Sequence, residues 1–191
     1  MRLFVALEIP EAVRRDVARR VAGLRERLPR ARWVDTSILH LTLLFLGEVD
    51  AARLRVLTPA LRTAFAKRRP LSLRLAGAGT FPAGRPARVA WVGMETPGDL
   101  TGLQVDLTTA AVASIGFTPE ERPFHPHVTL ARCDPPWPRD AVEKCVAAFP
   151  AAIGQPWVAD KGVLLESKLS PRGAQYRLVA ELPFQAGEVE E

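Results

Sequence analysis

The sequence has few cysteines, few histidines and no long apolar run, and each shortage excludes a class of protein. Its two cysteines, Cys133 and Cys145, form no C-x-x-C pattern and are too few for a zinc framework or a disulfide scaffold. The apolar stretch at the N-terminus is interrupted by Glu8 and Pro10, which makes it too short for a signal peptide. No apolar run approaches the length of a membrane span. We therefore expect a cytoplasmic enzyme or binding protein that has no membrane contact.

The composition is otherwise that of an ordinary globular protein. Hydrophobic residues make up 48% and charged residues 25% of the 191 positions, which suffices for the core of one domain or of one unit with two lobes. The formal net charge is +5, and 22 of the 26 basic residues are arginine, whose planar guanidinium matches phosphate oxygens. A GC-rich genome explains the same bias. The charge therefore permits a nucleic-acid partner without showing one.

Apolar periodicity predicts strands and helices in alternation along the chain. Several strands alternate polar and apolar residues, which favours antiparallel sheets covered on one face. The order of elements repeats once, so we predict one domain, residues 1–191, with an α+β fold. We expect it to be bilobal and pseudo-duplicated, each lobe an antiparallel sheet with helices on its outer face and a cleft between the lobes. The expected strands lie near 2–8, 39–46, 71–77, 87–94, 127–132, 157–168 and 175–183, and the helices near 11–28, 54–65, 98–114 and 139–149, with a Gly/Pro loop before residue 87.

All three histidines stand close to a threonine in two strand-like phrases, HLTLLFLG at residues 40–47 and FHPHVTLAR at residues 124–132. Side chains at i and i+2 of a strand share a face. His40 and Thr42 therefore point to one side of the first phrase, and Phe45 is expected on the opposite side, in the core. The two phrases occupy corresponding places in the repeated order of elements.

The second phrase presents the same pair of functional groups. His125, His127 and Thr129 are expected to share one face, so each phrase supplies an imidazole with a hydroxyl beside it. Across a cleft, two imidazoles suit acid–base chemistry near neutral pH, and two hydroxyls suit the nonbridging oxygens of a phosphate. Phosphodiester cleavage needs these parts. A cyclic phosphodiester needs no metal in principle, because its ring holds the leaving group in place.

Two alternative roles for the histidines stay open at this point. A buried histidine bonded to a backbone carbonyl is the common structural role of a single H-x-T phrase. His40, His125 and His127 also make three imidazoles, the ligand set of an open zinc site. The lack of a nearby acidic residue, which ligating histidines usually have as a partner, counts against the metal site.

The phrases HLTLLFLG and PHVTLAR together resemble the paired H-x-T-x signature of the 2H phosphoesterase superfamily. More narrowly, the chain resembles the bacterial and archaeal RNA 2′,3′-cyclic phosphodiesterases, also known as the 2′-5′ RNA ligase family. The likeness covers nearly the whole chain, and includes RLFVALEIP, RWVDTSILHLTLLFLGEVD, GTFPAGRPARVAWVG and SKLSPRGAQYRLV. It implies a bilobal fold whose lobes each contribute one motif, residues 40–43 and 127–130, to a central cleft.

The resemblance also implies a reaction and the residues that perform it. Members of the family hydrolyse RNA 2′,3′-cyclic phosphate ends to 2′-phosphomonoesters without a metal or other cofactor. His40 matches the proton donor and His127 the proton acceptor, while Thr42 and Thr129 match the phosphate-binding residues. The site can also run backward and join a 5′-hydroxyl in a 2′-5′ linkage. Cleavage of small cyclic nucleotides and a non-catalytic, basic RNA-binding module are the alternatives, and we expect a monomer.

Further positions around the two motifs have less defined roles. Arg132 is the best candidate for a guanidinium clamp on phosphate, and His125 is a second candidate for a substrate contact. For both, an exposed residue at a strand end is the alternative. Leu44 stands where relatives often have a basic residue, which removes one expected phosphate contact. Trp91 and Tyr176 belong either to the core or to a cleft wall on which bases stack.

Overall fold

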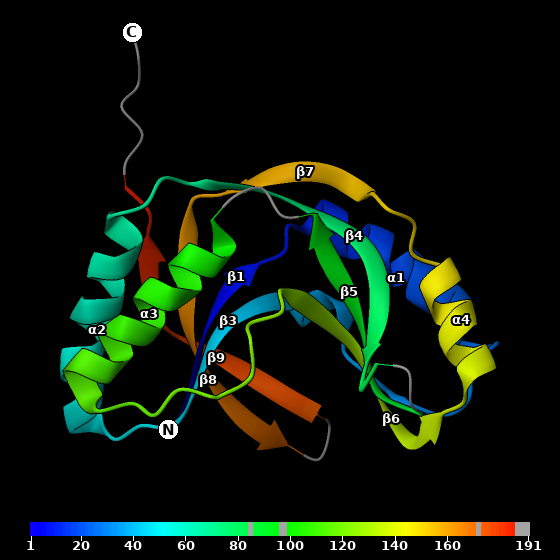
Figure 1. Cartoon of the computed structure of the whole chain (residues 1–191), viewed down its shortest axis with the longest axis horizontal. Helices are drawn as coiled ribbons and strands as arrows, with labels where there is room; N and C mark the ends of the chain where they lie inside the picture. Colours follow the sequence, from blue (N-terminus) through cyan, green and yellow to red (C-terminus); the bar gives the residue numbers. More distant parts are fainter. Residues whose placement is uncertain (84–85, 96–98, 171–172, 186–191) are drawn as a thin grey trace, which may run out of the picture.

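The computed structural model describes residues 1–83, 86–95, 99–170 and 173–185, and these form two antiparallel sheets with helices on their outer sides (Figure 1). The first sheet has the order β3-β1-β8-β9, made of His40–Glu48, Arg2–Glu8, Lys161–Ser170 and Gly173–Pro183. The second sheet has the order β2-β6-β5-β4-β7, made of Arg32–Trp33, His127–Trp137, Ala87–Glu95, Leu71–Phe81 and Ile153–Ala159. The predicted two-lobed α+β fold is confirmed.

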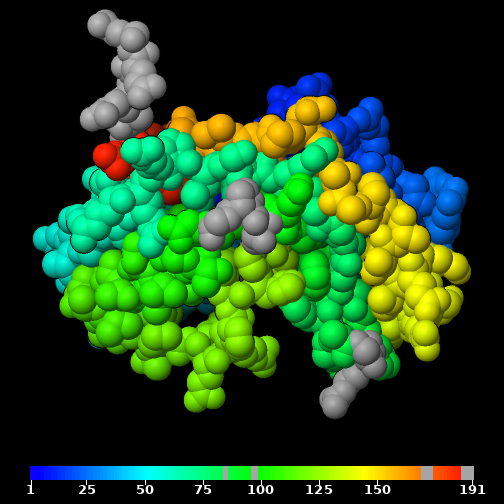
Figure 2. Space-filling model, turned by 45° about the horizontal axis from the view of Figure 1, so that its top comes forward, coloured from blue at the N-terminus to red at the C-terminus, as the bar shows by residue number. Residues whose placement is uncertain are grey.

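The helices divide between the two lobes. They are α1 (Glu11–Arg25), α2 (Ala51–Ala66), α3 (Leu100–Ile115) and α4 (Arg139–Ala147), with a short 3-10 helix, η1, at Thr36–Ile38. Helices α2 and α3 lie side by side on the first sheet, whereas α1 and α4 cover the second (Figure 1). In the space-filling view, α1 in blue and α4 in yellow accordingly lie together, on the side away from α2 and α3 (Figure 2). Both sheets thus turn their other face inward.

The two lobes are not the two halves of the sequence. In the first half, β1 and β3 build the first sheet, but α1 packs on β7 and β4 pairs with β5 of the second sheet. In the second half, β5 and β6 build the second sheet, but α3 packs on α2 and β8 pairs with β1 of the first sheet. Each half therefore gives one helix and two strands to the other lobe, α1 with β2 and β4 from the first half and α3 with β8 and β9 from the second, which ties the lobes together.

Several predicted boundaries are wrong: the strand expected at 127–132 continues to Trp137, and two further differences have identifiable reasons. The Gly/Pro loop is expected to follow residue 77, but β4 continues to Phe81. The glycines belong to the strand, because Gly77 has φ +62° at a bulge and Gly79 leaves room for the ring of Trp91. The single strand expected at 157–168 is two strands, because the chain leaves the second sheet and enters the first at Asp160. The expected helix start at Gly98 lies outside the described residues, within which the helix is Leu100–Ile115.

Strand β1 is buried on both faces and separates the main core from the inner side of the first sheet. Leu3, Val5 and Leu7 point into the main core under α2 and α3, whereas Phe4 and Ala6 join Val163 in a small cluster on the other face. The inner face of the first sheet is therefore apolar beside β3, the strand that carries the first motif.

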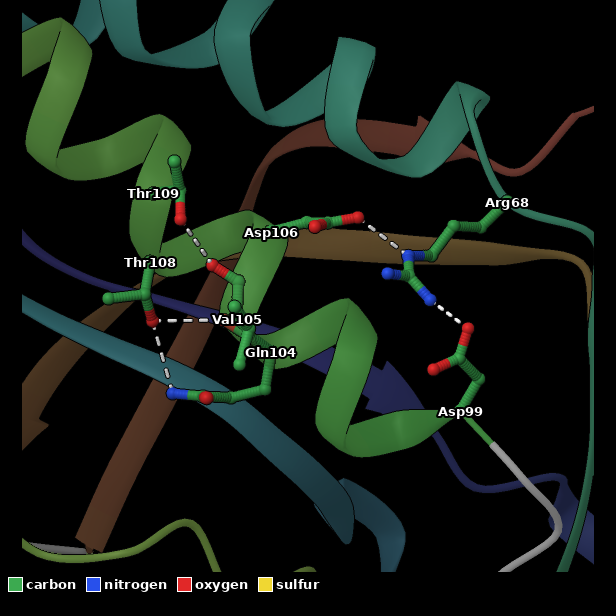
Figure 3. A network of polar contacts seen from close by, with 7 residues as sticks. All are labelled: Arg68, Asp99, Gln104, Val105, Asp106, Thr108 and Thr109. Atoms are coloured by element: carbon green, nitrogen blue, oxygen red, sulfur yellow. Dashed lines mark hydrogen bonds and ion pairs between the residues drawn. The ribbon is translucent and has the colours of Figure 1, made fainter.

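An arginine holds α3, which comes from the second half of the sequence, against α2 from the first (Figure 3). The Nε of Arg68, just after α2, donates a hydrogen bond to Asp106 at 2.7 Å, and a terminal nitrogen donates to Asp99. The side chain of Arg68 is only 19% exposed. Hydrogen bonds between ionised groups with this degree of burial are stronger than those of surface pairs.

We expect Arg68→Gln to lower the free energy of unfolding by about 1–3 kcal/mol, because Asp106 loses a charged hydrogen-bond donor. Thermal denaturation followed by circular dichroism measures the effect as a fall in Tm of about 2–4 °C per kcal/mol. Arg139→Gln is the matched control, since Arg139 pairs with Glu143 on α4 at 92% exposure and is expected to cost under about 0.5 kcal/mol. Equal losses in the two variants contradict the prediction.

Candidate active site

A cavity of about 1090 Å³ lies between the two sheets and receives side chains from both. Strands β1, β3, β8 and β9 line it from the first sheet, and β2 and β6 line it from the second. Strands β3 and β6, which carry the two H-x-T phrases, lie next to each other across this cavity. Its lining includes His40, Thr42, His127, Thr129 and Arg132. The structure therefore brings both phrases into one site.

A bulge in β3 changes which side chains enter the cavity after the first H-x-T. Thr42 lies opposite Ala6, but the next pair is Leu44 with Val5, so Leu43 is an extra residue on β3. The strand pattern shifts by one, which buries Leu44 and turns Phe45 to the side of Thr42. Phe45 is 39% exposed and lines the cavity, so its predicted place in the core is wrong.

Strand β6 has a bulge at the corresponding place. Thr129 lies opposite Trp91, but the next pair is Ala131 with Ala90, so Leu130 is the extra residue. Without this bulge Arg132 would fall on the side opposite Thr129. With it, Arg132 lines the cavity. The two motif strands therefore share one geometry, histidine, threonine, bulge and a third side chain, which is Phe45 in β3 and Arg132 in β6.

The two histidine rings are held in the same way by the backbone. His40 Nδ1 lies 2.9 Å from the carbonyl oxygen of Ile38, and His127 Nδ1 lies 2.7 Å from that of His125. Because a carbonyl only accepts, each Nδ1 carries the hydrogen and donates it. Each Nε2 is then the nitrogen that exchanges a proton with a bound substrate.

Aromatic rings pack against both imidazoles and fix their planes. The His40 ring lies 5.0 Å from Phe4 and 5.0 Å, edge to face, from Tyr176, whose phenol also lines the cavity. The His127 ring lies 5.1 Å from Phe81 and 6.1 Å from Trp91. Of the two residues with an open role, Tyr176 thus reaches the cavity, whereas Trp91 supports His127 from the sheet.

The surroundings lower the pKa of both histidines. Burial is the main cause in each, and the hydrogen bonds to Ile38 and to His125 partly oppose it. His127 has a further cause, because the neighbouring charge of His125 also lowers its pKa. Burial raises the pKa of Tyr176, and the charge of Arg132, which lines the same cavity, opposes this.

The structure does not bring His125 to the residues that line the cavity. Its ring packs against Trp91, at 4.8 Å, and against Phe81, at 5.6 Å, and lies 6.3 Å from the ring of His127. The three imidazoles of the alternative zinc site therefore do not converge. In the part of the chain that the structure describes, no group of three or more His, Cys, Asp or Glu could hold a metal ion.

The charge of the cavity is strongly positive. Four arginines line it, Arg2, Arg25, Arg32 and Arg132, and Asp35 is the one carboxylate among the described lining residues. Arg32 comes from β2, a strand of two residues in the second sheet. Sequence analysis missed Arg2, Arg25 and Arg32, because each belongs to a different segment and no local pattern distinguishes it from the other arginines.

Two strands that face one another with an imidazole, a hydroxyl and a surrounding positive field define a phosphoesterase of the two-histidine class. The family model described as LigT-like phosphoesterase matches residues 7–91 and 95–176. The RNA 2′,3′-cyclic phosphodiesterase of Methanothermobacter thermautotrophicus is 32% identical over 177 residues, or 92% of this chain and 95% of the relative. That of Thermotoga maritima is 30% identical over 190 residues, 98% of this chain and 97% of the relative.

Solved structures agree with the sequence comparison. A crystal structure from Thermus thermophilus superposes with a TM-score of 0.79 at 28% identity, covering 98% of this chain and 100% of the other. Ligand-free E. coli LigT gives 0.76 at 26% identity, covering 97% and 98%. The chain belongs to the LigT-like family of 2H phosphoesterases, as its paired motifs predicted.

Among the described residues, no helix is both long and apolar enough to cross a membrane. The monomeric state and the cytoplasmic location stay predictions.

Proposed function

We propose that the chain hydrolyses RNA 2′,3′-cyclic phosphate ends to 2′-phosphomonoesters, with His40 as proton donor, His127 as proton acceptor and no metal ion. The observation that carries the proposal is the convergence of two H-x-T strands on one arginine-lined cavity, with both Nδ1 atoms engaged by carbonyl oxygens. The names of the Methanothermobacter and Thermotoga relatives support the substrate class.

The proposed reaction assigns each imidazole one proton transfer. Nε2 of neutral His127 removes a proton from water as the water oxygen attacks phosphorus. The bond from phosphorus to the 3′ oxygen breaks, and that oxygen takes the proton from Nε2 of protonated His40. The product carries a 2′-phosphate and a free 3′-hydroxyl. The enzyme then has the proton on His127 and regains its starting state by exchange with solvent.

Negative charge grows on the phosphoryl oxygens during the attack, and three side chains are placed to stabilise it. The Thr42 and Thr129 hydroxyls flank the two histidines on the same strand faces, and Arg132 follows Thr129 after the bulge. Hydroxyls and a guanidinium donate hydrogen bonds to phosphate oxygens without taking a proton from the reaction.

The difference between the two histidines supports their assigned roles. Burial lowers the pKa of His127, and the charge of His125 beside it lowers the pKa further, which favours the neutral form that a base needs. Among the causes of the pKa shift of His40 there is no such cation. An anionic phosphate in the cavity raises the pKa of both histidines, and the absence of such a cation at His40 favours for His40 the protonated form that an acid needs.

Ligation uses the same groups in the opposite direction, with a 5′-hydroxyl in place of water. A cavity of about 1090 Å³, whose described lining includes four arginines, has room and charge for the 5′-hydroxyl end of a second RNA strand. We therefore keep 2′-5′ ligation as the second candidate activity. A mixture of a cyclic phosphate RNA and a 5′-hydroxyl RNA tests it directly.

The decisive experiment is incubation with a short RNA that ends in a 2′,3′-cyclic phosphate, in excess EDTA. We expect hydrolysis to a 2′-phosphate, which chromatography against standards distinguishes from a 3′-phosphate. A 3′-phosphate product overturns the assignment of the leaving oxygen. Loss of activity in EDTA that returns with an added metal overturns metal independence, and binding without any product supports a non-catalytic RNA-binding module.

We expect bell-shaped pH dependence, with the maximum of kcat/KM below about pH 6.5, the ordinary pKa of histidine. Activity rises with pH as His127 loses its proton and falls as His40 loses its own, and the pKa of both groups is lowered in the free enzyme. Bound phosphate raises the pKa of both histidines, so we expect the maximum of kcat at a higher pH than the maximum of kcat/KM. Stopped assays measure both profiles over about pH 4.5 to 9, a range that extends on both sides of the ordinary histidine pKa.

The variant His125→Gln provides the control for this profile. Removing the neighbouring charge raises the pKa of His127, which moves the acid limb of kcat/KM to higher pH. The alkaline limb is expected to stay in place, because His125 is not among the causes that shift His40. A kcat/KM maximum well above neutral pH, or movement of the alkaline limb alone, contradicts the assignment of the two histidines.

A further inference from the structure

The cavity holds more positive charge than the proposed hydrolysis requires. A cyclic phosphodiester has a single negative charge, and Arg132 already faces it beside Thr129. Arg2, Arg25 and Arg32 line the same cavity. Among the described residues no ion pair involves any of these three. Arginines that line a cavity without an ion pair are typical of an anion-binding surface.

Arg32 and Arg132 lie directly opposite each other in the antiparallel pairing of β2 with β6. Residues in this relation have side chains on the same face, and like charges there destabilise the sheet. Both of these arginines face the cavity rather than the core. The pair therefore costs the fold stability when the cavity holds no anion, and anions over the two guanidinium groups remove that cost.

Arg25, the last residue of α1, lines the cavity together with Arg32. Its guanidinium lies 5.8 Å from the centre of the Trp33 ring, next to Arg32 on β2. Arg2, by contrast, belongs to the other sheet and lies 5.0 Å from the centre of the Phe45 ring. Asp35, the one carboxylate in the described lining, accepts a hydrogen bond from the Ser37 backbone at 2.8 Å and caps η1; its hydrogen bonds with Ser37 lower its pKa most, and the charge of Arg25 lowers the pKa further. Arg25 and Arg32 thus form a separate positive subsite beside Arg132.

We propose that Arg32 and Arg25 bind the phosphate on the 5′ oxygen of the terminal nucleotide while its 2′,3′-cyclic phosphate lies against Arg132. This inference rests on the proposed function and names its substrate class, an RNA end with a 5′-linked phosphate rather than a free cyclic nucleoside. Neighbouring strands lie about 4.8 Å apart, and two long side chains extend that span. This separation suits two phosphates joined through one ribose.

The test compares two substrates that differ by a single phosphate. One is adenosine 2′,3′-cyclic phosphate with a 5′-hydroxyl, and the other is the same compound with a 5′-phosphate. We expect wild-type kcat/KM to be about tenfold or more higher for the 5′-phosphorylated compound, the gain typical of a charged hydrogen bond. In Arg32→Gln and Arg25→Gln the ratio of the two values is expected to fall toward one.

Arg30→Gln is the matched control. Arg30 is exposed and close in sequence, but it does not line the cavity, so the variant makes the same change in net charge outside the subsite. It is expected to keep the wild-type ratio. A parallel measurement of affinity for the two products, adenosine 2′-phosphate and adenosine 2′,5′-bisphosphate, gives a readout that does not depend on turnover.

The outcomes separate this inference from the proposed function. A wild-type ratio near one, or an Arg32→Gln loss that is equal for both substrates, overturns the subsite. Failure to hydrolyse both compounds and also the short RNA with a 2′,3′-cyclic phosphate end overturns the proposed function. In that case an affinity difference between the products that disappears in Arg32→Gln still supports the subsite, and the lack of such a difference overturns it as well.

Discussion

Replacing His127 with asparagine is expected to lower kcat for hydrolysis of a 2′,3′-cyclic phosphate RNA by a factor of about 10²–10⁴, the usual contribution of a general base. Asparagine places its amide nitrogen close to where Nδ1 of His127 lies, so it can still donate to the carbonyl oxygen of His125. The variant lacks Nε2, which is the atom proposed to accept the proton of water. It therefore separates proton transfer from the local structure of β6.

His40→Asn is expected to cause a loss of similar size with the natural substrate, for the opposite reason. It keeps the donor to Ile38 and removes the proposed source of the proton for the 3′ oxygen. A cyclic substrate with sulfur at the 3′ bridging position distinguishes the two roles, because a thiolate leaves without a proton. With this substrate we expect His40→Asn to approach the wild-type rate, whereas His127→Asn stays inactive.

His125→Asn is the control for both variants, since its ring is outside the cavity lining and its carbonyl is part of the backbone. It is expected to keep kcat within about tenfold, consistent with a residue that acts only through a neighbouring pKa. Circular dichroism and thermal denaturation show whether all three variants fold alike. Rescue of His127→Asn rather than of His40→Asn by the sulfur substrate would reverse the two assignments.

The sequence predicts the faces of β3 and β6 correctly up to the threonine of each motif, and not beyond. Alternation with a period of two places His40 with Thr42 and His127 with Thr129, as the structure has them. It also places Phe45 in the core, which is wrong because Leu43 is an extra residue of β3. A bulge depends on how a strand pairs with its neighbour, here β1, and that pairing is absent from the local pattern.

The residues that surround the two motifs could not be predicted from the sequence either, because they come together only through tertiary structure. A strand of two residues, β2, has no periodicity, yet it places Arg32 opposite Arg132. The exchange of elements between lobes likewise follows from long-range pairing, since β8 near the C-terminus joins β1 at the N-terminus. Periodicity shows which residues a strand buries, whereas the partner of that strand is set by the packing of the whole chain.

The bulges give a physical reason to expect large effects from the threonines. Each threonine is the last residue before the shift, so its hydroxyl lies between a histidine and the side chain that the bulge brings into the cavity. For Thr42 this side chain is Phe45, and for Thr129 it is Arg132. A donor held at this point meets the phosphoryl oxygens whose charge grows in the transition state.

Thr42→Val and Thr129→Val are each expected to lower kcat/KM by a factor of about 10²–10³, the effect of removing one preorganised donor from a developing oxyanion. Valine keeps the shape and the β-branched preference for a strand, so the fold is expected to stay intact. Thr→Ser at the same positions is the matched control, because serine keeps the hydroxyl and is expected to retain most activity.

The two threonines also test whether the pseudo-symmetric motifs act on one phosphate. If both hydroxyls bind the same phosphoryl group, the loss in the Thr42→Val, Thr129→Val double variant differs from the product of the two single losses, since contacting groups are not additive. If the two losses multiply, the hydroxyls act on separate groups. Because β3 and β6 lie next to each other and both threonines line one cavity, we expect non-additivity. Single-turnover kinetics of all four proteins on one cyclic phosphate RNA measure it.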